Sequence, residues 1–185
     1  MKKLFLDTAG EYFNIAIIEN NKVVFFESKK NNNDVVNQSL NYLHIFLNKN
    51  KISLKDIKGY YFTIGPGSFT GTKVALNIIN SFNLVFPTFD FNYITNYDLL
   101  KNENKRFVLI KLSKQKYYLH DFMKKNQRNS GRIIDVLQTK EDFNIVNGYK
   151  EFNKKVLEEK LIKNKFKKVD NLVKINLFYA NDFVN

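Results

Sequence analysis

Residues 62–75 read Phe-Thr-Ile-Gly-Pro-Gly-Ser-Phe-Thr-Gly-Thr-Lys-Val-Ala, and this stretch decides the fold. It holds three of the seven glycines and one of the two prolines of the chain, all between Gly65 and Gly71. A sequence that uses glycine so sparingly clusters it where the backbone needs a positive φ or where two segments approach closely. The run Gly59–Ile64 predicts a strand before this loop, and Val74–Val85 predicts a helix after it.

Two interpretations of the glycine loop differ in function. In the first, it is a tight strand-to-helix turn, which explains the glycines without any ligand. In the second, it cradles a phosphate, but a Walker loop needs Gly directly before the Lys, and this chain has Thr72 before Lys73. The dinucleotide fingerprint needs its third glycine three positions after the second, and Gly71 lies four after Gly67. Both nucleotide patterns therefore fail by one position.

The segments around the loop predict a mixed α/β order. Asp34 is the predicted N-cap of a helix that runs to about Leu47, and Asn20-Asn21 is a predicted hairpin turn. Pro87 ends the helix after the loop, and a fifth strand is predicted over Thr88–Phe91. Such an order suits an antiparallel meander joined to a crossover unit. The three strands at the start are predicted over Leu4–Asp7, Phe13–Ile18 and Lys22–Glu27.

Composition excludes several chemistries. The 185 residues include no Cys, which excludes disulfides, thiolate-bound metals and a cysteine nucleophile. The two histidines, His44 and His120, lie 76 positions apart, so no paired metal-ligand spacing exists, and each is expected to be structural or solvated. The longest uncharged run, Val74–Phe89, is too short to span a bilayer. We therefore expect a cytoplasmic protein without a membrane segment.

Positive charge is concentrated in the second half of the chain. The net charge is +12, but 27 Asn and 27 Lys beside 3 Arg and 4 Ala indicate an AT-rich genome, so part of that charge reflects codon usage. Residues 1–100 carry a net charge of +2 and residues 101–185 a net charge of +10. The polar stretch Lys101–Lys105 is the predicted boundary between two domains, 1–100 and 101–185. In the second, strands are predicted over Arg106–Leu112, Lys116–Phe122, Ile133–Leu137 and Asn144–Val146, and a basic amphipathic helix over Phe152–Phe166.

The glycine loop resembles the signature segment of the TsaB (YeaZ) family, the bacterial accessory subunit for threonylcarbamoyladenosine modification of tRNA. Leu4–Ala9 resembles the family's opening Ile-Asp-Thr-Ala, and Leu177–Asn181 resembles its closing Pro-x-Tyr-Leu-Arg. The resemblance covers about residues 1–100 and is loose thereafter. It implies an actin/sugar-kinase/Hsp70-like (ASKHA) α/β fold of two ribonuclease-H-like lobes, the second reduced. The matched signature residues are Gly65, Pro66, Gly67, Ser68, Phe69, Thr70 and Gly71.

The same resemblance implies a scaffold without catalytic residues, metal or cofactor. Its partners would be a TsaD-like catalytic subunit and, through it, a TsaE-like ATPase that together modify the adenosine beside the anticodon. Kinases of this superfold place a magnesium-linked Asp where Asp7-Thr8 stands, but in TsaB this Asp is mostly structural. Lys111-Leu112-Ser113 replaces the family's Asp-Ala-Arg, and Asp34-Val35 replaces its frequent His-Thr. The alternative function is an ATP-dependent enzyme or metallopeptidase of the same superfold.

Two further surfaces are predicted. Each of the two helices in the first half has two adjacent apolar lines where a sheet-covering helix needs one. The second line would bind a TsaD-like subunit or a second copy of the chain; the alternative is one broad stripe that faces the core. The lysines of the C-terminal helix would touch tRNA indirectly or weakly; the alternative is a solvated face. The predicted partner residues are Val35, Tyr42, Phe46, Ala75, Ile79 and Phe82, and the predicted tRNA contacts are Lys154, Lys155, Lys163 and Lys167.

Overall fold

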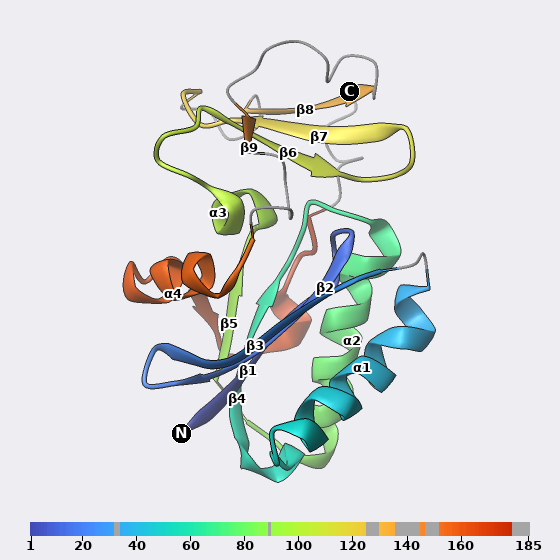
Figure 1. Ribbon diagram of the computed structural model, residues 1–185, viewed down its shortest axis with the longest axis vertical. Helices are drawn as coiled ribbons and strands as arrows, with labels where there is room; N and C mark the ends of the chain where they lie inside the picture. Colours follow the sequence, from blue (N-terminus) through green and yellow to red (C-terminus); the bar gives the residue numbers. More distant parts are fainter. Residues whose placement is uncertain (32–33, 89, 125–129, 136–144, 147–151, 179–185) are drawn as a thin grey trace.

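The computed structural model describes residues 1–31, 34–88, 90–124, 130–135, 145–146 and 152–178. They form a six-stranded sheet in the order β10-β5-β4-β1-β2-β3 and a four-stranded sheet in the order β8-β7-β6-β9 (Figure 1). The large sheet comprises β1 (Lys2–Asp7), β2 (Tyr12–Glu19), β3 (Lys22–Lys30), β4 (Ile57–Thr63), β5 (Phe91–Ile94) and β10 (Lys167–Val169). The small sheet comprises β6 (Phe107–Lys111), β7 (Lys116–Asp121), β8 (Gly131–Asp135) and β9 (Ile145–Val146). The helices are α1 (Val35–Lys49), α2 (Phe69–Val85), α3 (Asn96–Leu100) and α4 (Lys154–Ile162), with 3-10 turns η1 (Leu54–Asp56) and η5 (Leu172–Lys174).

The first half has the predicted meander and crossover. Strands β1, β2 and β3 pair in antiparallel fashion, whereas β1, β4 and β5 pair in parallel. The β2–β3 hairpin turns at Asn20 and Asn21, whose φ angles are 51° and 59°. Two consecutive residues with positive φ match the right-handed twist of the flanking strands, and asparagine tolerates that conformation better than most residues. The chain crosses from β4 to β5 through α2, as the strand–loop–helix pattern predicted.

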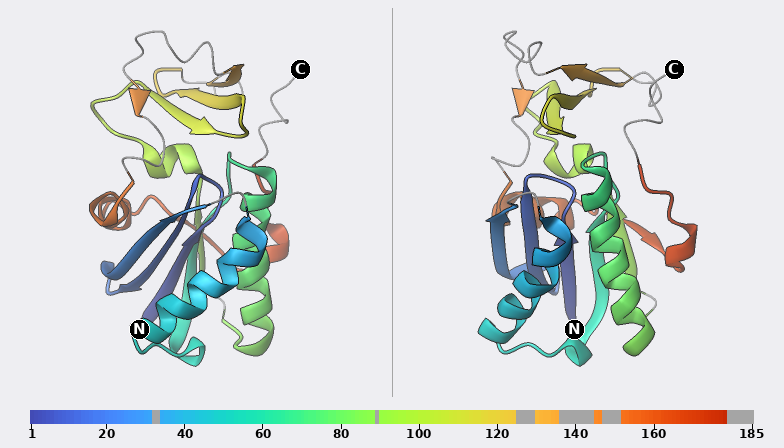
Figure 2. Two further views of the ribbon diagram at one scale, coloured as in Figure 1. Left: turned by 45° about the vertical axis from the view of Figure 1, so that its right-hand side comes forward. Right: turned by 90° about the vertical axis from the view of Figure 1, so that its right-hand side faces the viewer.

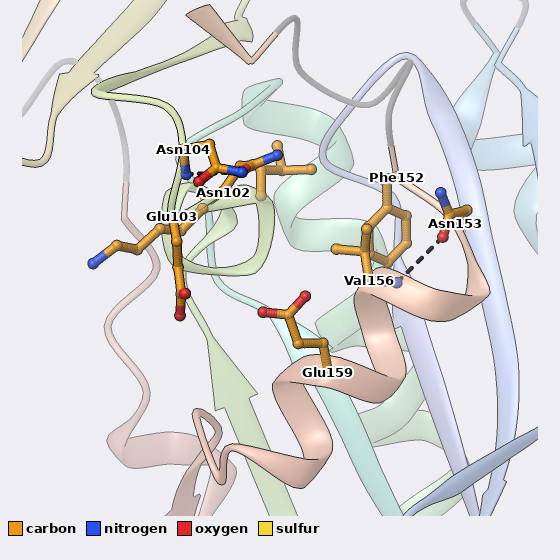
Figure 3. A pocket seen from close by; sticks show the side chains of 9 residues that line it. Asn102, Glu103, Asn104, Phe152, Asn153, Val156 and Glu159 are labelled. Atoms are coloured by element: carbon orange, nitrogen blue, oxygen red, sulfur yellow. Dashed lines mark hydrogen bonds between the residues drawn. The ribbon is translucent and has the colours of Figure 1, made fainter.

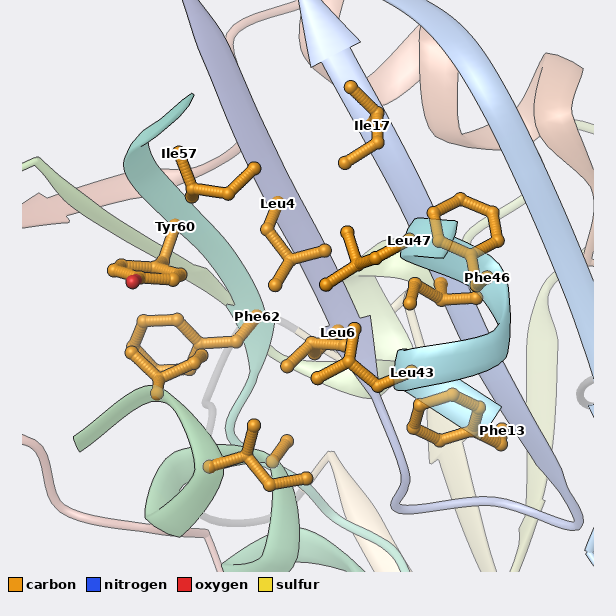
Figure 4. Packing of buried hydrophobic residues seen from close by; sticks show 14 of the residues in the cluster. Leu4, Leu6, Phe13, Ile17, Leu43, Phe46, Leu47, Ile57, Tyr60 and Phe62 are labelled. Carbon is orange, nitrogen blue, oxygen red and sulfur yellow. The ribbon is translucent and has the colours of Figure 1, made fainter. Parts of the chain in front are cut away.

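Helices α1 and α2 lie side by side on one face of the large sheet (Figure 2). Alternate side chains of the central strands point to that face, because the side-chain period of a strand is two. In Figure 4, Leu4 and Leu6 of β1 and Phe62 of β4 pack with Leu43 and Phe46 of α1. These residues are buried and form the larger of the two main cores.

The opposite face of the large sheet carries α3, α4 and the small sheet. Phe5 of β1 and Tyr61 of β4 point to this side and contact the ring of Phe166, with centroids 6.4 and 4.7 Å away. Leu157 and Leu161 of α4 are buried in the same cluster. The second core therefore joins the large sheet to the C-terminal part of the chain.

The spatial division of the chain differs from the predicted boundary at residue 100. The chain leaves the large sheet near Lys101, as predicted, builds the small sheet, and then returns. Strand β10, which the sequence did not predict, pairs with β5, and α4 packs on β3. Residues 152–178 thus belong to the large sheet, because their apolar side chains complete its second core.

Several predicted bounds shift by a few residues. The fifth strand begins at Phe91 rather than Thr88, because the Thr88 amide donates to the Asn83 side chain and its hydroxyl donates to the Lys58 carbonyl, which makes a turn. Helix α4 begins only after Asn153, which caps it, and ends before Asn164, whose φ is +50°. Across the described ranges, no helix is both long and apolar enough to cross a membrane.

Candidate functional site

The glycine loop connects the end of β4 to the start of α2 and lies against the end of β1. Ser68 caps α2: its side chain accepts from the Gly71 amide at 3.4 Å. The Ser68 amide donates to the Ala9 carbonyl at 2.8 Å. Thr8 accepts from the Ala75 amide at 3.1 Å and donates to the Gly71 carbonyl at 2.5 Å. The loop and the first strand are thus joined by hydrogen bonds from both sides.

Each loop glycine has a steric reason in this arrangement. A Cβ on Gly71 would collide with the Thr8 carbonyl oxygen, and one on Gly67 would lie 2.5 Å from the Ala9 carbonyl oxygen. Gly65 has a φ of +95°, and a Cβ there would collide with the Phe178 carbonyl oxygen. Backbone atoms cannot move aside as a flexible side chain can, so no larger residue fits at these positions. The close approach is to the chain itself, which is the tight-turn interpretation.

Asp7 is the polar centre of this junction. It is fully buried at the end of β1, and four donors surround its carboxylate. The Thr63 hydroxyl donates to Oδ1 at 2.7 Å, and the Ala9 amide does so at 3.1 Å. The side-chain amide of Asn14 donates to Oδ2 at 3.1 Å and that of Asn96 to Oδ1 at 3.4 Å. A buried carboxylate that accepts these hydrogen bonds holds β1, β2, β4 and the start of α3 together.

Sequence reasoning missed the three side chains that meet Asp7. Asn14 could have been found, because the predicted hairpin register places it directly opposite Asp7 on β2. Thr63 and Asn96 had no local signal, since Thr63 ends β4 and Asn96 begins α3 just after β5, and both meet Asp7 only after the parallel strands pair. Asn96 also accepts from the Gly65 amide at 2.8 Å, so it ties the glycine loop to the same centre.

A cavity of about 400 Å³ opens beside the glycine loop. Gly10, Ser68 and Thr70 line one side, and Lys111 and Lys114 of the small sheet line the other. Glu11 accepts from Lys111 across it, with 2.6 Å between the two charged atoms, and this pairing raises the pKa of Lys111. Within the described part of the chain, no three His, Cys, Asp or Glu side chains gather as metal ligands.

The structure corrects half of the predicted partner residues. Phe46, Ala75 and Ile79 are buried in the first core and have no surface to offer a partner. The physical reason is that α1 and α2 pack on each other as well as on the sheet, so each helix needs a broad apolar stripe. Val35, Tyr42 and Phe82, the other predicted residues, are half-buried.

The exposed apolar surface of these helices lies elsewhere. A groove of about 530 Å³ runs between the C-terminal halves of α1 and α2. Leu40 is 54% exposed at its edge, and Phe82 and Phe86 line it from α2 and the residue after it. Leu84 of α2 is 85% exposed but is not among the residues that line the groove. We call this surface the α1–α2 groove; its members are Leu40, Leu43, His44, Leu47, Asn48, Ile52, Ser53, Leu54, Phe82 and Phe86.

Solved structures show which fold this is. An uncharacterized protein of Pseudomonas aeruginosa with similarity to the peptidase YeaZ superposes with a TM-score of 0.55, over 72% of this chain and 66% of that one. The YeaZ of the same organism superposes with a TM-score of 0.51, over 72% and 64%. Both are 15% identical in sequence, so the likeness is one of fold. The fold resembles that of YeaZ.

Sequence comparisons add relatives without a known role. No family model matches the chain. An uncharacterized protein of Mycoplasma genitalium is 42% identical over 88 residues, and its homolog in Mycoplasma pneumoniae is 33% identical over 87. The match covers 46% of this chain and 45% and 44% of those proteins. The chain therefore spans less than half the length of the curated relatives that it matches.

The lysines proposed to touch tRNA differ in their surroundings on the YeaZ-like fold. Lys154, Lys155 and Lys167 are exposed. Lys163 instead pairs with Glu103 at 2.5 Å and Glu159 at 3.0 Å, and these bonds raise its pKa. Figure 3 shows the two glutamates on either side of a pocket between α4 and the loop before β6. The charge of Lys163 is therefore compensated within the chain.

The two histidines lie in different surroundings. His44 is exposed on α1, 2.9 Å from the side-chain nitrogen of Asn48. His120 is buried in β7, stacked on Tyr97 with 4.1 Å between ring centroids and edge-on to Phe122. Burial lowers the pKa of His120 below its usual value. The imidazole is thus a buried part of the contact between α3 and the small sheet.

Proposed function

We propose that the chain is a non-catalytic scaffold subunit of the machinery that adds threonylcarbamoyl to the adenosine beside the tRNA anticodon. In this role it binds a TsaD-like catalytic subunit in the cytoplasm and, through it, a TsaE-like ATPase. The YeaZ-like fold and the Gly65–Gly71 signature support the proposal. The proposal concerns this chain alone, because its match covers less than half the length of each curated relative.

The observation that carries the proposal is the α1–α2 groove. Two of its apolar lining residues, Leu40 and Phe86, are 54% and 37% exposed. Contiguous apolar surface of this kind marks a site of protein contact more often than a free surface. An amphipathic helix of a partner fits a groove between two helices, because its apolar stripe repeats every three to four residues. The same groove would serve a second copy of the chain if it homodimerises.

Two glutamate substitutions on one helix test this docking surface. Leu40→Glu puts a charge at the edge of the groove, whereas Ile45→Glu puts the same charge on an exposed position of α1 outside it. We expect Leu40→Glu to weaken binding to the TsaD-like subunit of the same organism at least 30-fold, or about 2 kcal/mol, because an unpaired carboxylate would be buried. Ile45→Glu should change the dissociation constant less than about threefold.

Calorimetric titration with the purified partner measures both variants. If Leu40→Glu and the unchanged chain bind the partner with equal affinity, the interface does not include the groove. No binding by the unchanged chain would refute the scaffold function itself. Because Leu40 and Ile45 are both exposed, neither variant is expected to unfold.

The alternative function is an ATP-dependent enzyme or metallopeptidase of the same superfold. The cavity beside the glycine loop, with Lys111 and Lys114 on one wall, is the place where such an enzyme would bind a phosphate. We propose instead that the purified chain hydrolyses neither ATP nor peptides, since Asp7 is buried and saturated by the chain's own donors. Turnover that co-purifies with the chain and is abolished by Lys114→Gln would favour the enzyme.

A further inference from the structure

A second cavity lies on the small sheet, far in sequence from the glycine loop. It has a volume of about 270 Å³ and is formed where β6 begins, β7 ends and β8 begins (Figure 1). Three cations line it: Arg106, Lys124 and Arg132. Asp121 is the single carboxylate in its wall. We call this cavity the Arg106 pocket.

Arg106 is held in a fixed orientation at this pocket. Its Nε donates to Asp121 Oδ1 at 3.0 Å and its Nη2 donates to Oδ2 at 2.7 Å, which is a bidentate pair. The guanidinium also lies over the ring of Phe107, 4.7 Å from the centroid. The Met123 amide donates to the same Asp121 at 3.0 Å, and these bonds lower the pKa of Asp121. The carboxylate is therefore neutralised by Arg106 and does not repel an anion in the pocket.

Bidentate pairing uses only part of the guanidinium. It engages Nε and Nη2, and no residue that the structure describes accepts from Nη1. A guanidinium has five N–H donors in a rigid plane that matches the oxygens of a phosphate. Because the plane is already fixed by Asp121 and Phe107, binding an anion costs little further side-chain entropy.

The other two cations of the pocket lie at its surface. Lys124 and Arg132 are exposed, and neither forms an ion pair with any residue in the described ranges. Lys163 of α4 differs, since two glutamates hold it. Three cations against one paired carboxylate leave a net charge of +2 at the pocket. Such a site recognises a phosphate group.

The positive charge around the pocket favours a phosphate polymer over a free phosphate as its ligand. Residues 101–185 carry a net charge of +10, and Lys105 directly precedes Arg106 in the chain. A polymer gains from every one of these charges through counterion release, whereas a single phosphate gains only from the pocket. We propose that the Arg106 pocket binds a backbone phosphate of RNA. This contact is independent of the partner subunit of the proposed function.

Two charge-matched double variants of the full chain test the proposal. Lys124→Gln with Arg132→Gln removes two cations from the pocket, and Lys154→Gln with Lys155→Gln removes two exposed cations from α4. The probe is a labelled, unmodified tRNA transcript, and its fluorescence anisotropy is followed over a series of salt concentrations without any partner protein. All four positions are exposed, so both variants should fold.

We expect the pocket variant to bind the transcript at least tenfold more weakly at low salt. Its plot of log K against log salt should also be shallower by about 1, since the loss of one phosphate contact removes about 1 from the slope. The α4 variant should lose less than threefold. Equal losses in both variants would show that only the total charge matters, and no binding by the unchanged chain would also overturn the proposal.

Inorganic phosphate distinguishes the two sources of the ligand. If it displaces the transcript at a phosphate concentration similar to that of competing RNA phosphates, the pocket is a site for free phosphate and the RNA assignment is wrong. If displacement needs at least a hundredfold more phosphate, the polymer is the ligand. Loss of binding to the TsaD-like subunit would leave this result unchanged, so the two proposals fail separately.

Discussion

Asp7 and Asp121 are each the last residue of a strand, and each accepts several hydrogen bonds, yet the two carboxylates have different roles. The named donors to Asp7 are a hydroxyl, a backbone amide and two side-chain amides, all of them uncharged. Asp121 instead receives a guanidinium whose side chain is 53% exposed. The first carboxylate joins strands to the glycine loop, and the second orients a cation at the surface.

The role of a buried carboxylate depends on the charge and the exposure of its hydrogen-bond partners. When its partners are neutral and internal, the hydrogen bonds stabilise the fold and leave nothing to bind a ligand. When its partner is a half-exposed cation with unused donors, the carboxylate fixes a group that can still bind. The signature loop of this chain therefore marks structure, and the less conspicuous corner of the small sheet offers a binding group.

The largest expected loss of stability comes from disturbing the packing of the glycine loop against β1. In Gly71→Ala, the new Cβ would collide with the Thr8 carbonyl oxygen, so loop and strand must separate. We expect a loss of about 3–5 kcal/mol in the free energy of unfolding, measured by urea denaturation, or failure to fold. Thr70→Ala, one residue earlier and exposed, should cost less than about 0.5 kcal/mol. A similar small loss for both variants would show that the loop can move.

The two carboxylates can be compared directly by the same substitution. Asp7→Asn replaces an acceptor oxygen by an NH₂ group that faces buried donors, and we expect a loss of about 3 kcal/mol. Asp121→Asn should cost about 1 kcal/mol, because water solvates the exposed Arg106 when its partner is lost. Chemical denaturation of both variants gives the comparison. Equal losses would contradict the distinction between a structural and an orienting carboxylate.

Sequence reasoning recovered what depends on local pattern. The meander, the glycine loop and α2 follow from alternation, turn residues and capping, all of which are local. The strand pair of the small sheet was also recovered, because Arg106–Leu112 and Lys116–Phe122 alternate clearly. Strand β10 has three residues, of which two are exposed lysines, so its pattern carries no strand signal.

The sequence alone did not show which faces of the helices are buried or which distant residues meet. Ile79 was assigned to the apolar line that would bind a partner, yet both it and the adjacent Ile78 are buried. A helix that packs on a sheet and on another helix buries more than one apolar line. Likewise, Asp121 and Arg106 lie 15 positions apart and meet only because β6 and β7 pair in register. Residues 179–181, which are part of the closing resemblance, lie outside the described residues.

The contact between the two sheets should depend on pH through His120. Burial lowers its pKa, while Asp98 and Asp121 act to raise it and Lys101 to lower it further. The unfolded chain therefore binds a proton more readily, and stability is complete above about pH 6.5 and falls as the pH drops below it. The slope reaches at most about 1.4 kcal/mol per pH unit.

Urea denaturation between pH 7 and pH 5 measures this effect before most carboxylates titrate. His120→Gln should abolish the slope in that interval, whatever its effect on stability at pH 7. The other histidine, His44, is exposed and serves as a control in His44→Gln, which should keep the slope. Parallel curves for the unchanged chain and His120→Gln would show that His120 is not the titrating group.

The smallest expected effect is that of the ion pair across the cavity beside the glycine loop. Glu11 and Lys111 connect the end of the first hairpin to the small sheet at 2.6 Å, but their side chains are 38% and 33% exposed. Water and salt screen such a pair, so its coupling energy should be below about 1 kcal/mol. A double-mutant cycle with Glu11→Gln and Lys111→Gln measures that energy from denaturation at low and at high salt. We expect it to approach zero at about 1 M salt, because the two sheets are joined mainly by the buried rings around His120. A coupling of several kcal/mol that persists at high salt would instead make this surface pair, like Asp7, a structural centre of the fold.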